Sequence, residues 1–532
     1  MVTLTAHTDA GLLVFDYYHR FIMAVFSSGR ALLLSVLVYV AYVQGRPNPL
    51  SRDGHWPTTS PARSEHHANL DMDTSAIYHQ HVQRASQRYS RMLGSLVEKR
   101  FNQAVIEHAV SHLQDTQSNA SAPANLLILD ESDNPNPKGS GFSPIGLEIA
   151  LVQPVIRAEQ PRHPNSIGLD IQANDIGYIA TVQIGTPPKN FSLFVDSGSS
   201  DLWVGHEDCK GYDVGDCGAH TFLGNSSTTF NNTGDPWHIR YGAGFVLGKI
   251  VTDLVSIAGL QPKAPHKFGV AMEESPEFAS SKVPYDGFLG TAKSHLSQQR
   301  APTLIEALRD SGLVTEGIVS YHIPRALDTM KAGAPVKNVG ELTLGAMNPA
   351  KFNASTLVTV RNVSPTGFWE APIDEVRING TSIGLPRRSA ILDTGSTLLV
   401  APKEDVSAIH KLIPGSLYTG TRWIIPCTTN ATISLVVSGQ EFPIDSRDLL
   451  FLPLNMGRLK GYCWSTISEM HGVSKPKGTN ISKTGGKTTS WLVGDVFLKN
   501  VYFSTNLDRD TISLARLAEQ PDVTELDDKA AN

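Results

Sequence analysis

Alternating apolar and polar residues dominate the chain from about residue 168 to residue 517. Segments such as Tyr178–Ile184 alternate and are bounded by Gly, Pro or Asn, which is typical of β-strands. Trp369–Ile383 alternates around an Asn-Gly dipeptide, which favours a two-residue hairpin turn. Helical periodicity is rare here and predicts short helices over Ala301–Leu313 and Lys403–Leu412. The pattern therefore predicts a mainly β protein.

The region from residue 46 to about residue 160 has a different pattern. Its apolar residues recur at three- and four-residue steps and predict an amphipathic helix over roughly Ser86–Gln114. Ser118–Pro144 is rich in Asn, Pro, Ser and Gly, as linkers are. The helix belongs either to a removable segment whose apolar stripe docks on the rest of the chain or to a stable accessory domain. Eight of the 18 histidines lie here, and because His gains charge between about pH 5 and 8, acid could loosen this region: His55, His66, His67, His79, His81, His108, His112 and His163.

The N-terminus predicts a secretory signal. The apolar run Ala31–Val43 follows Arg30 and precedes Gly45, and it falls short of the ~20 residues that a membrane span needs. We therefore expect translation to begin at Met23, with residues 1–45 forming an N-terminal extension plus the signal peptide. The alternative is a buried or membrane-anchoring helix. At the other end, residues 518–532 form a polar acidic tail without a lipid-anchor signal.

Composition narrows the classes of partner and site. A chain of 532 residues with 41% hydrophobic and 18% charged residues can form two or three folded domains. Its net charge of -6 offers no basic field for nucleic acid. The four cysteines lack Cys-x-x-Cys spacing, so we expect no metal site, and they alone allow three disulfide pairings. Nine Asn-x-Ser/Thr sequons predict surface glycosylation on an exported chain: Asn119, Asn190, Asn225, Asn231, Asn353, Asn362, Asn379, Asn430 and Asn480.

One short motif occurs twice, in Phe194–Ser200 and in Ile391–Thr397. Each copy has two apolar residues followed by Asp, a hydroxyl residue, Gly and Ser. A single copy would suggest only a polar turn after a strand. Two copies with matching apolar residues before them favour a paired site with Asp196 and Asp393 at its centre.

Paired carboxylates have a specific chemistry. Two of them about 3 Å apart share one proton over a wide acidic range. The ionised member can activate a water molecule while the protonated member polarises a carbonyl, which hydrolyses an amide without a metal or cofactor. The glycines let the two loops approach each other, and the hydroxyl groups can fix the carboxylates. We therefore expect these residues to support the pair: Ser197, Gly198, Ser199, Thr394, Gly395 and Ser396.

The two motifs and their surroundings resemble the pepsin-like aspartic proteases, with a fungal type favoured. The resemblance extends to Tyr178–Val204, to Asp286–Gly290 and to Trp491–Phe497, and it covers about residues 168–517. It implies a mainly β, bilobal fold with an N-terminal lobe at 161–350, a C-terminal lobe at 351–517 and an active-site cleft between them. It also implies that Asp196 and Asp393 are the catalytic dyad, and that residues 46–160 are a prosegment.

The resemblance assigns further roles. It implies a flap at Tyr241-Gly242-Ala243, with Tyr241 over the dyad and hydrogen-bonded toward Trp203. Large apolar residues around the cut are expected to fit a pocket lined by Tyr285, Phe288 and Phe278. It also implies disulfides within each half, Cys209–Cys217 and Cys427–Cys463.

The sequence departs from the family at a few positions. Ala243 lacks the hydroxyl or carboxylate found in some members, so no preference for lysine before the cut is expected. Asp201 stands where Asn is common and adds a charge near the dyad, and Ser197 keeps the hydroxyl of the commoner Thr. Family prosegments are usually shorter and place a lysine against the dyad, and this sequence assigns no such lysine.

The resulting hypothesis is an acid endopeptidase made as a zymogen. Its partners would be protein and peptide substrates and its own prosegment, with no stable membrane anchor. We expect a monomer in the secretory pathway, either secreted or vacuolar. Two alternatives stay open: a catalytically silent binding or inhibitor protein on the same scaffold, and a narrow protease that processes specific proproteins.

Overall fold

The computed structural model describes ten ranges of the chain, all within one compact unit, Asp71–Asn532. The ranges are 74–94, 155–172, 175–213, 215–218, 220–241, 244–329, 336–385, 388–454, 459–470 and 490–518. The expected signal peptide, linker and acidic tail lie outside them, as do Gly242, Ala243, Asn119 and Asn480. Within these ranges no helix has both the length and the apolar character needed to cross a membrane.

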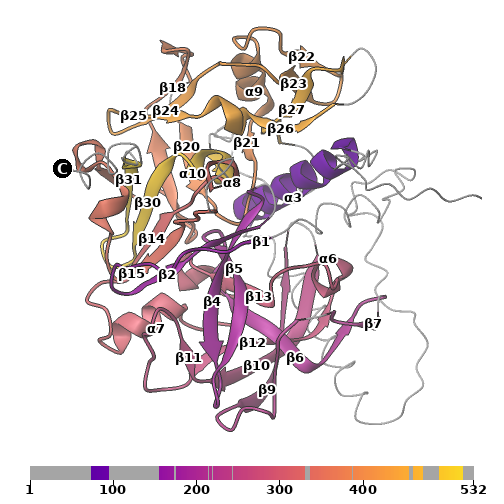
Figure 1. Cartoon of the computed structure of the whole chain (residues 1–532), viewed down its shortest axis with the longest axis vertical. Helices are drawn as coiled ribbons and strands as arrows, with labels where there is room; N and C mark the ends of the chain where they lie inside the picture. Colours follow the sequence, from indigo (N-terminus) through magenta and orange to yellow (C-terminus); the bar gives the residue numbers. More distant parts are fainter. Residues whose placement is uncertain are drawn as a thin grey trace, which may run out of the picture. The chain divides into compact units, whose positions relative to one another are not determined.

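The N-terminal lobe is built on one large, mixed sheet (Figure 1). Its central strands β5 and β13 are parallel, and β13 and the last four residues of β5 are buried, which explains the apolar run Leu193–Val195. The order along the sheet is β1 (Val155–Ile156), β3 (Asp170–Gln172), β4 (Gly177–Ile184), β5 (Lys189–Asp196), β13 (Gly287–Gly290), β6 (Leu202–Gly211), β12 (His266–Glu274), β10 (Phe245–Asp253) and β9 (Asn231–Arg240); β11 (Val255–Ser256) pairs with β4, and β7 (Gly215–Asp216) and β8 (Phe222–Leu223) pair with β6.

The described part of the C-terminal lobe contains three smaller sheets. The first has the order β17 (Glu370–Ile373), β20 (Arg388–Leu392), β29 (Ser490–Val493), β21 (Leu399–Ala401) and β28 (Ile467–Glu469). The second has β19 (Thr381–Ser382), β18 (Glu375–Ile378), β24 (Ile433–Val437) and β25 (Gln440–Ile444). The third has β22 (Leu417–Tyr418), β23 (Trp423–Pro426), β27 (Tyr462–Ser465) and β26 (Leu450–Pro453).

A further sheet joins strands from both halves of the sequence. Its order is β16 (Val358–Arg361), β31 (Thr511–Arg516), β30 (Val501–Asn506), β14 (Ile318–His322), β15 (Glu341–Leu344) and β2 (Ser166–Gly168). Its strands come from both sides of residue 350, so the sheet is shared by the two halves of the sequence. The expected mainly β, bilobal pepsin-like fold is confirmed.

The two helices and the hairpin turn predicted within the lobes lie at or close to their predicted positions. The helix expected over Ala301–Leu313 is α7 (Leu304–Asp310), which Thr303 and Glu306 begin with a capping box. The helix expected at Lys403 is α9 (Lys403–His410). The hairpin turn occurs at Asn379 and Gly380, whose φ angles are 50° and 76°. Among the described residues, three further short α-helices are α6 (Pro276–Ala279), α8 (Ala326–Thr329) and α10 (Asp495–Leu498).

The disulfide prediction is also confirmed, because Cys209 pairs with Cys217 and Cys427 pairs with Cys463. Glycosylation stays a prediction, although six of the sequon asparagines are exposed: Asn190, Asn225, Asn231, Asn353, Asn379 and Asn430. Asn362 is half-buried, and its side-chain amide donates to the Phe368 carbonyl at 3.0 Å. It is the least suited of the described sequons to carry a glycan.

The helix of the region before the lobes begins earlier than predicted. Helix α3 spans Thr74–Gly94, and the residues from 95 to 114 that were expected to continue it lie outside the described ranges. Its residues Tyr78, Val82 and Ala85 are buried. The helix contacts β21 and β26 and lies beside them in Figure 1. Its sequence is polar on average, so packing of this apolar face rather than local propensity stabilises it.

Candidate active site

Each motif follows the last residues of a buried strand. Asp196 is the last residue of β5, and Asp393 directly follows β20. A second parallel strand lies beside each: Gly290 of β13 is in register with Asp196, and Val493 of β29 is in register with Leu392. The segments expected to cross behind the two loops therefore do so, with the same local arrangement in each lobe.

The two loops are bonded to each other through their hydroxyl residues. The Ser197 amide donates to Thr394 Oγ1, and the Thr394 amide donates to Ser197 Oγ, both at 2.9 Å. Each hydroxyl then donates to a carbonyl of the opposite loop, Ser197 to Leu392 and Thr394 to Val195, again at 2.9 Å. These four bonds hold the carboxylates of the two lobes in a fixed relation.

Each carboxylate accepts two bonds from its own loop. Gly198 N and Ser199 Oγ donate to Asp196 at 2.9 and 2.6 Å. Gly395 N and Ser396 Oγ donate to Asp393 at 3.0 and 2.6 Å. Both aspartates have 0% relative exposure. Four of the residues predicted to support the pair therefore donate to it directly, whereas Ser197 and Thr394 bond the two loops to each other.

Gly198 and Gly395 are required because each lies very close to the aspartate of the opposite loop. A Cβ atom on Gly198 would lie 2.5 Å from Asp393 Oδ1, and one on Gly395 would lie 2.5 Å from Asp196 Oδ1. Contacts this short exclude any side chain at either position. The two loops therefore pack closely enough to bring both carboxylates to one point.

Arg88 of helix α3 occupies that point. Its Nη2 atom bonds to Asp196 Oδ1 and donates to Asp393 Oδ1 at 2.8 Å, and its Nε atom lies 2.6 Å from Asp393 Oδ2. Burial opposes the charge of this guanidinium, but Asp196 and Asp393 together raise the pKa of Arg88. One cation therefore offsets part of the negative charge of the pair and fills the space in which a reacting group would sit.

The environment also perturbs two acids of the site. Burial, with Asp196 next to it, raises the pKa of Asp393 to about 6, although Arg88, Ser396 and Gly395 act against the shift. Burial likewise raises the pKa of Asp201 to about 6. Asp201 does not contact the dyad; it accepts bonds from Ser297 Oγ at 2.6 Å and from Gln298 N at 3.0 Å. Its main role in this structure is to hold the chain after β13.

The predicted flap and pocket residues form one aromatic cluster. Trp203 Nε1 donates to the Tyr241 hydroxyl at 2.7 Å, as the resemblance implied. The Phe288 ring lies 4.7 Å from Tyr241 and stacks on Trp203 at 5.4 Å, and Tyr285 lies 5.4 Å from Phe288. Phe278 belongs to the same cluster. Tyr241 stands between β9 and β10, at the tip of a hairpin whose next two residues are not described.

Sequence reasoning missed the residues by which α3 binds. Arg88 was not identified because no motif surrounds it and its partners are 108 and 305 residues away. Tyr78 was also missed; it is 1% exposed and its ring stacks on Trp464 at 5.0 Å. The apolar periodicity that predicted a helix over Ser86–Gln114 does not include Tyr78.

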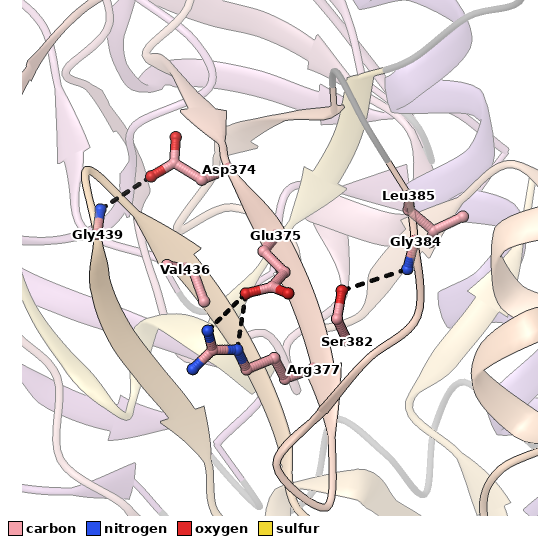
Figure 2. Close-up of a pocket in the computed structure, with 8 residues that line it drawn as sticks. All are labelled: Asp374, Glu375, Arg377, Ser382, Gly384, Leu385, Val436 and Gly439. Atoms are coloured by element: carbon pink, nitrogen blue, oxygen red, sulfur yellow. Dashed lines mark hydrogen bonds and ion pairs between the residues drawn. The ribbon is translucent and has the colours of Figure 1, made fainter.

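A separate cavity of about 570 Å³ lies on the C-terminal lobe, among β18, β19 and β24 (Figure 2). Its charged groups are already satisfied within the lobe. Arg377 Nε donates to Glu375 at 2.7 Å, and Asp374 accepts from Gly439 N at 2.9 Å (Figure 2). None of its lining residues belongs to the two Asp loops, so this cavity is not part of the candidate active site.

Comparisons with known proteins agree with this geometry. A family model described as "Eukaryotic aspartyl protease" matches residues 177–517. A "Probable aspartic-type endopeptidase CTSD" of Arthroderma benhamiae is 32% identical over 360 residues, which are 67% of this chain and 64% of that protein. An "Aspartic-type endopeptidase ctsD" of Aspergillus fumigatus is 29% identical over 73% of this chain and 77% of its own length. Human "Cathepsin D" is 27% identical over 65% of this chain and 81% of its own length.

Proposed function

The chain belongs to the eukaryotic aspartyl protease family, and on that premise we propose that it is an aspartic endopeptidase made as a zymogen. The observation that carries the proposal is the contact of both Asp196 and Asp393 with the single guanidinium of Arg88. Two carboxylates that bind one small group can equally hold one water molecule between them once that group leaves. In the proposed zymogen, α3 is the part of the prosegment that occupies their site.

The proposed reaction uses general acid and base catalysis. In acid the buried pair shares one proton, which the raised pKa of Asp393 supports. The ionised member takes a proton from the water, and the protonated member donates to the carbonyl oxygen of the peptide bond. The resulting tetrahedral carbon loses the amine after a proton is returned to its nitrogen. The hydroxyl and amide donors of the two loops hold both carboxylates in place throughout.

Specificity and location are parts of the same proposal. The aromatic cluster of Tyr241, Tyr285 and Phe288 favours large apolar side chains next to the cut. Substrates would bind extended, with main-chain bonds to the flap hairpin. Two disulfides and exposed sequons support passage through the secretory pathway.

The test is hydrolysis of unfolded globin at pH 3 to 6 by the acid-treated full chain, with and without a statine-type inhibitor. Asp196→Asn and Asp393→Asn should each abolish the activity. Asp374→Asn, an acid of the separate cavity, is the matched control and should keep it. If a folded, disulfide-bonded Arg88→Met chain showed no inhibitable hydrolysis, the silent binding protein would be the better explanation.

A further inference from the structure

The ring of Tyr78 fills a pocket of the C-terminal lobe, which we call the Tyr78 pocket and define by Trp464, Phe451, Ser465 and Arg422. The ring stacks on Trp464 at 5.0 Å with 8° between the planes and meets Phe451 at 5.4 Å. Its hydroxyl donates to the Ser465 carbonyl at 2.6 Å. The pocket therefore surrounds a phenol on its face, its edge and its polar end.

A cation completes the pocket. The guanidinium carbon of Arg422 lies 5.5 Å from the Tyr78 centroid and 5.9 Å from the Trp464 centroid. A guanidinium at such a distance attracts the electron-rich face of an aromatic ring, and the attraction grows as water is excluded. An aliphatic side chain would gain nothing from this cation, and phenylalanine would leave the Ser465 carbonyl without the phenolic donor. The chemistry of the pocket thus favours tyrosine over other apolar residues.

The pocket and the dyad are covered by the same helix. Tyr78 and Arg88 both belong to α3, and ten residues of helix rise by about 15 Å. An extended peptide covers about 15 Å in four or five residues, at about 3.3 Å each. Because α3 is one continuous helix, withdrawal of Arg88 from the dyad also withdraws Tyr78 from its pocket. A substrate that reaches the dyad then finds the pocket open.

We propose that the Tyr78 pocket is a substrate subsite that binds a tyrosine side chain four or five residues from the bond that is cut. This inference rests on the proposed endopeptidase function. It adds a recognition element on the C-terminal lobe to the aromatic cluster beside the flap. In the zymogen, Tyr78 holds the place that the substrate tyrosine takes in the active enzyme.

The experiment compares two sets of quenched fluorescent peptides on the acid-activated full chain. Short peptides span three residues on either side of the cut, and long peptides carry Tyr, Phe, Leu or Ala at the third to sixth position on each side. At one position, Tyr should raise kcat/KM over Ala by roughly 10- to 100-fold, and over Phe by a few-fold. Arg422→Gln and Phe451→Leu should each reduce that Tyr preference and leave hydrolysis of the short peptides unchanged.

Arg377→Gln is the matched control, since it removes an arginine of the same lobe that lies outside the Tyr78 pocket. It should keep the full Tyr preference. The inference is overturned if no distant position prefers Tyr, or if the preference is the same in both pocket variants, because the pocket would then serve only to hold α3. Either result comes with normal cleavage of the short peptides, whereas failure of the proposed function would abolish cleavage of every peptide.

Discussion

His81 is the residue through which acid should release helix α3. Its side chain is 7% exposed, and its ring lies 5.1 Å from Phe451. Burial, with Arg84 one turn further along α3, lowers the pKa of His81 from 6.5 to about 3. The docked helix therefore holds His81 neutral at a pH at which the same residue in water would carry a proton.

Acid should weaken the docking of α3 because docking lowers the pKa of His81. Above pH 6.5 neither form binds the proton, so docking is unaffected. Between pH 6.5 and about 3 the undocked form is protonated and the docked form is not, so docking weakens by about 1.4 kcal/mol per pH unit. At pH 4 the loss is about 3 kcal/mol, a factor of the order of 10² in the docking equilibrium. Below about pH 3 the loss levels off.

The perturbation is His81→Gln, which cannot gain a proton. The full-length variant should stay latent at pH 7, and its acid activation should move to lower pH by about one unit, with activation at pH 4 slower by at least about 10-fold. The assay follows the loss of full-length chain on a gel and the appearance of peptide hydrolysis after pH jumps from 7 to values between 6 and 3. His163→Gln is the control, because His163 lies outside α3.

Two outcomes would refute the reasoning. If His81→Gln activated at the same pH and rate as the wild type and His163→Gln, the proton on His81 would not drive release. If it were active at pH 7, the substitution would simply have weakened docking.

Three further predictions concern the dyad and the lobes. Arg88→Met should weaken the docking of α3, because breaking a buried ion pair costs about 3–5 kcal/mol. Peptide hydrolysis by the untreated chain at pH 5.5 should therefore rise by at least about 10-fold, and Arg88→Lys should give an intermediate rate. Ser197→Ala should lower the free energy of unfolding by about 2 kcal/mol, since it leaves the Thr394 amide without its acceptor, while Ser197→Thr should be close to wild type by calorimetry. Replacing Cys427 and Cys463 by Ser should destabilise the chain by about 4 kcal/mol in denaturant unfolding, because the bond spans 36 residues.

The dyad was predictable because its signal is local and repeated. Each Asp sits in a tight turn after a buried strand, and the turn needs the same Gly and hydroxyl residues in both halves. The strands were predictable for the same reason, since alternation and turn residues are properties of a few neighbouring positions. The sheet shared by both halves of the sequence was not predictable. Its strands β14 and β30 are far apart in the chain, since the paired residues Ser320 and Ser504 are separated by 184 positions.

The contacts made by helix α3, unlike the dyad, could not be predicted from local sequence. Its buried residues Tyr78, Val82 and Ala85 form a short stripe among histidines, glutamines and arginines. The prediction of a helix over Ser86–Gln114 was based on the longer apolar repeat that follows these residues. What selects the observed docking is the fit of Tyr78 on Trp464 and of Arg88 between two carboxylates, and neither partner can be identified from sequence separation or periodicity.

The arginine at position 88 limits the ways in which the proposed latent state could end. A planar guanidinium presents several donors and contacts both carboxylates at once, which a lysine ammonium does less well. It also stays charged at every relevant pH, because Asp196 and Asp393 raise its pKa against the effect of burial. Release therefore cannot come from Arg88 losing its proton. Release by acid would come from groups that gain a proton, such as Asp393, whose protonation weakens the ion pair, and His81, whose protonation is incompatible with its buried site. Both act in the same direction as pH falls, so the proposed latent state should be strongest near neutral pH and weakest in the acid in which the dyad would work.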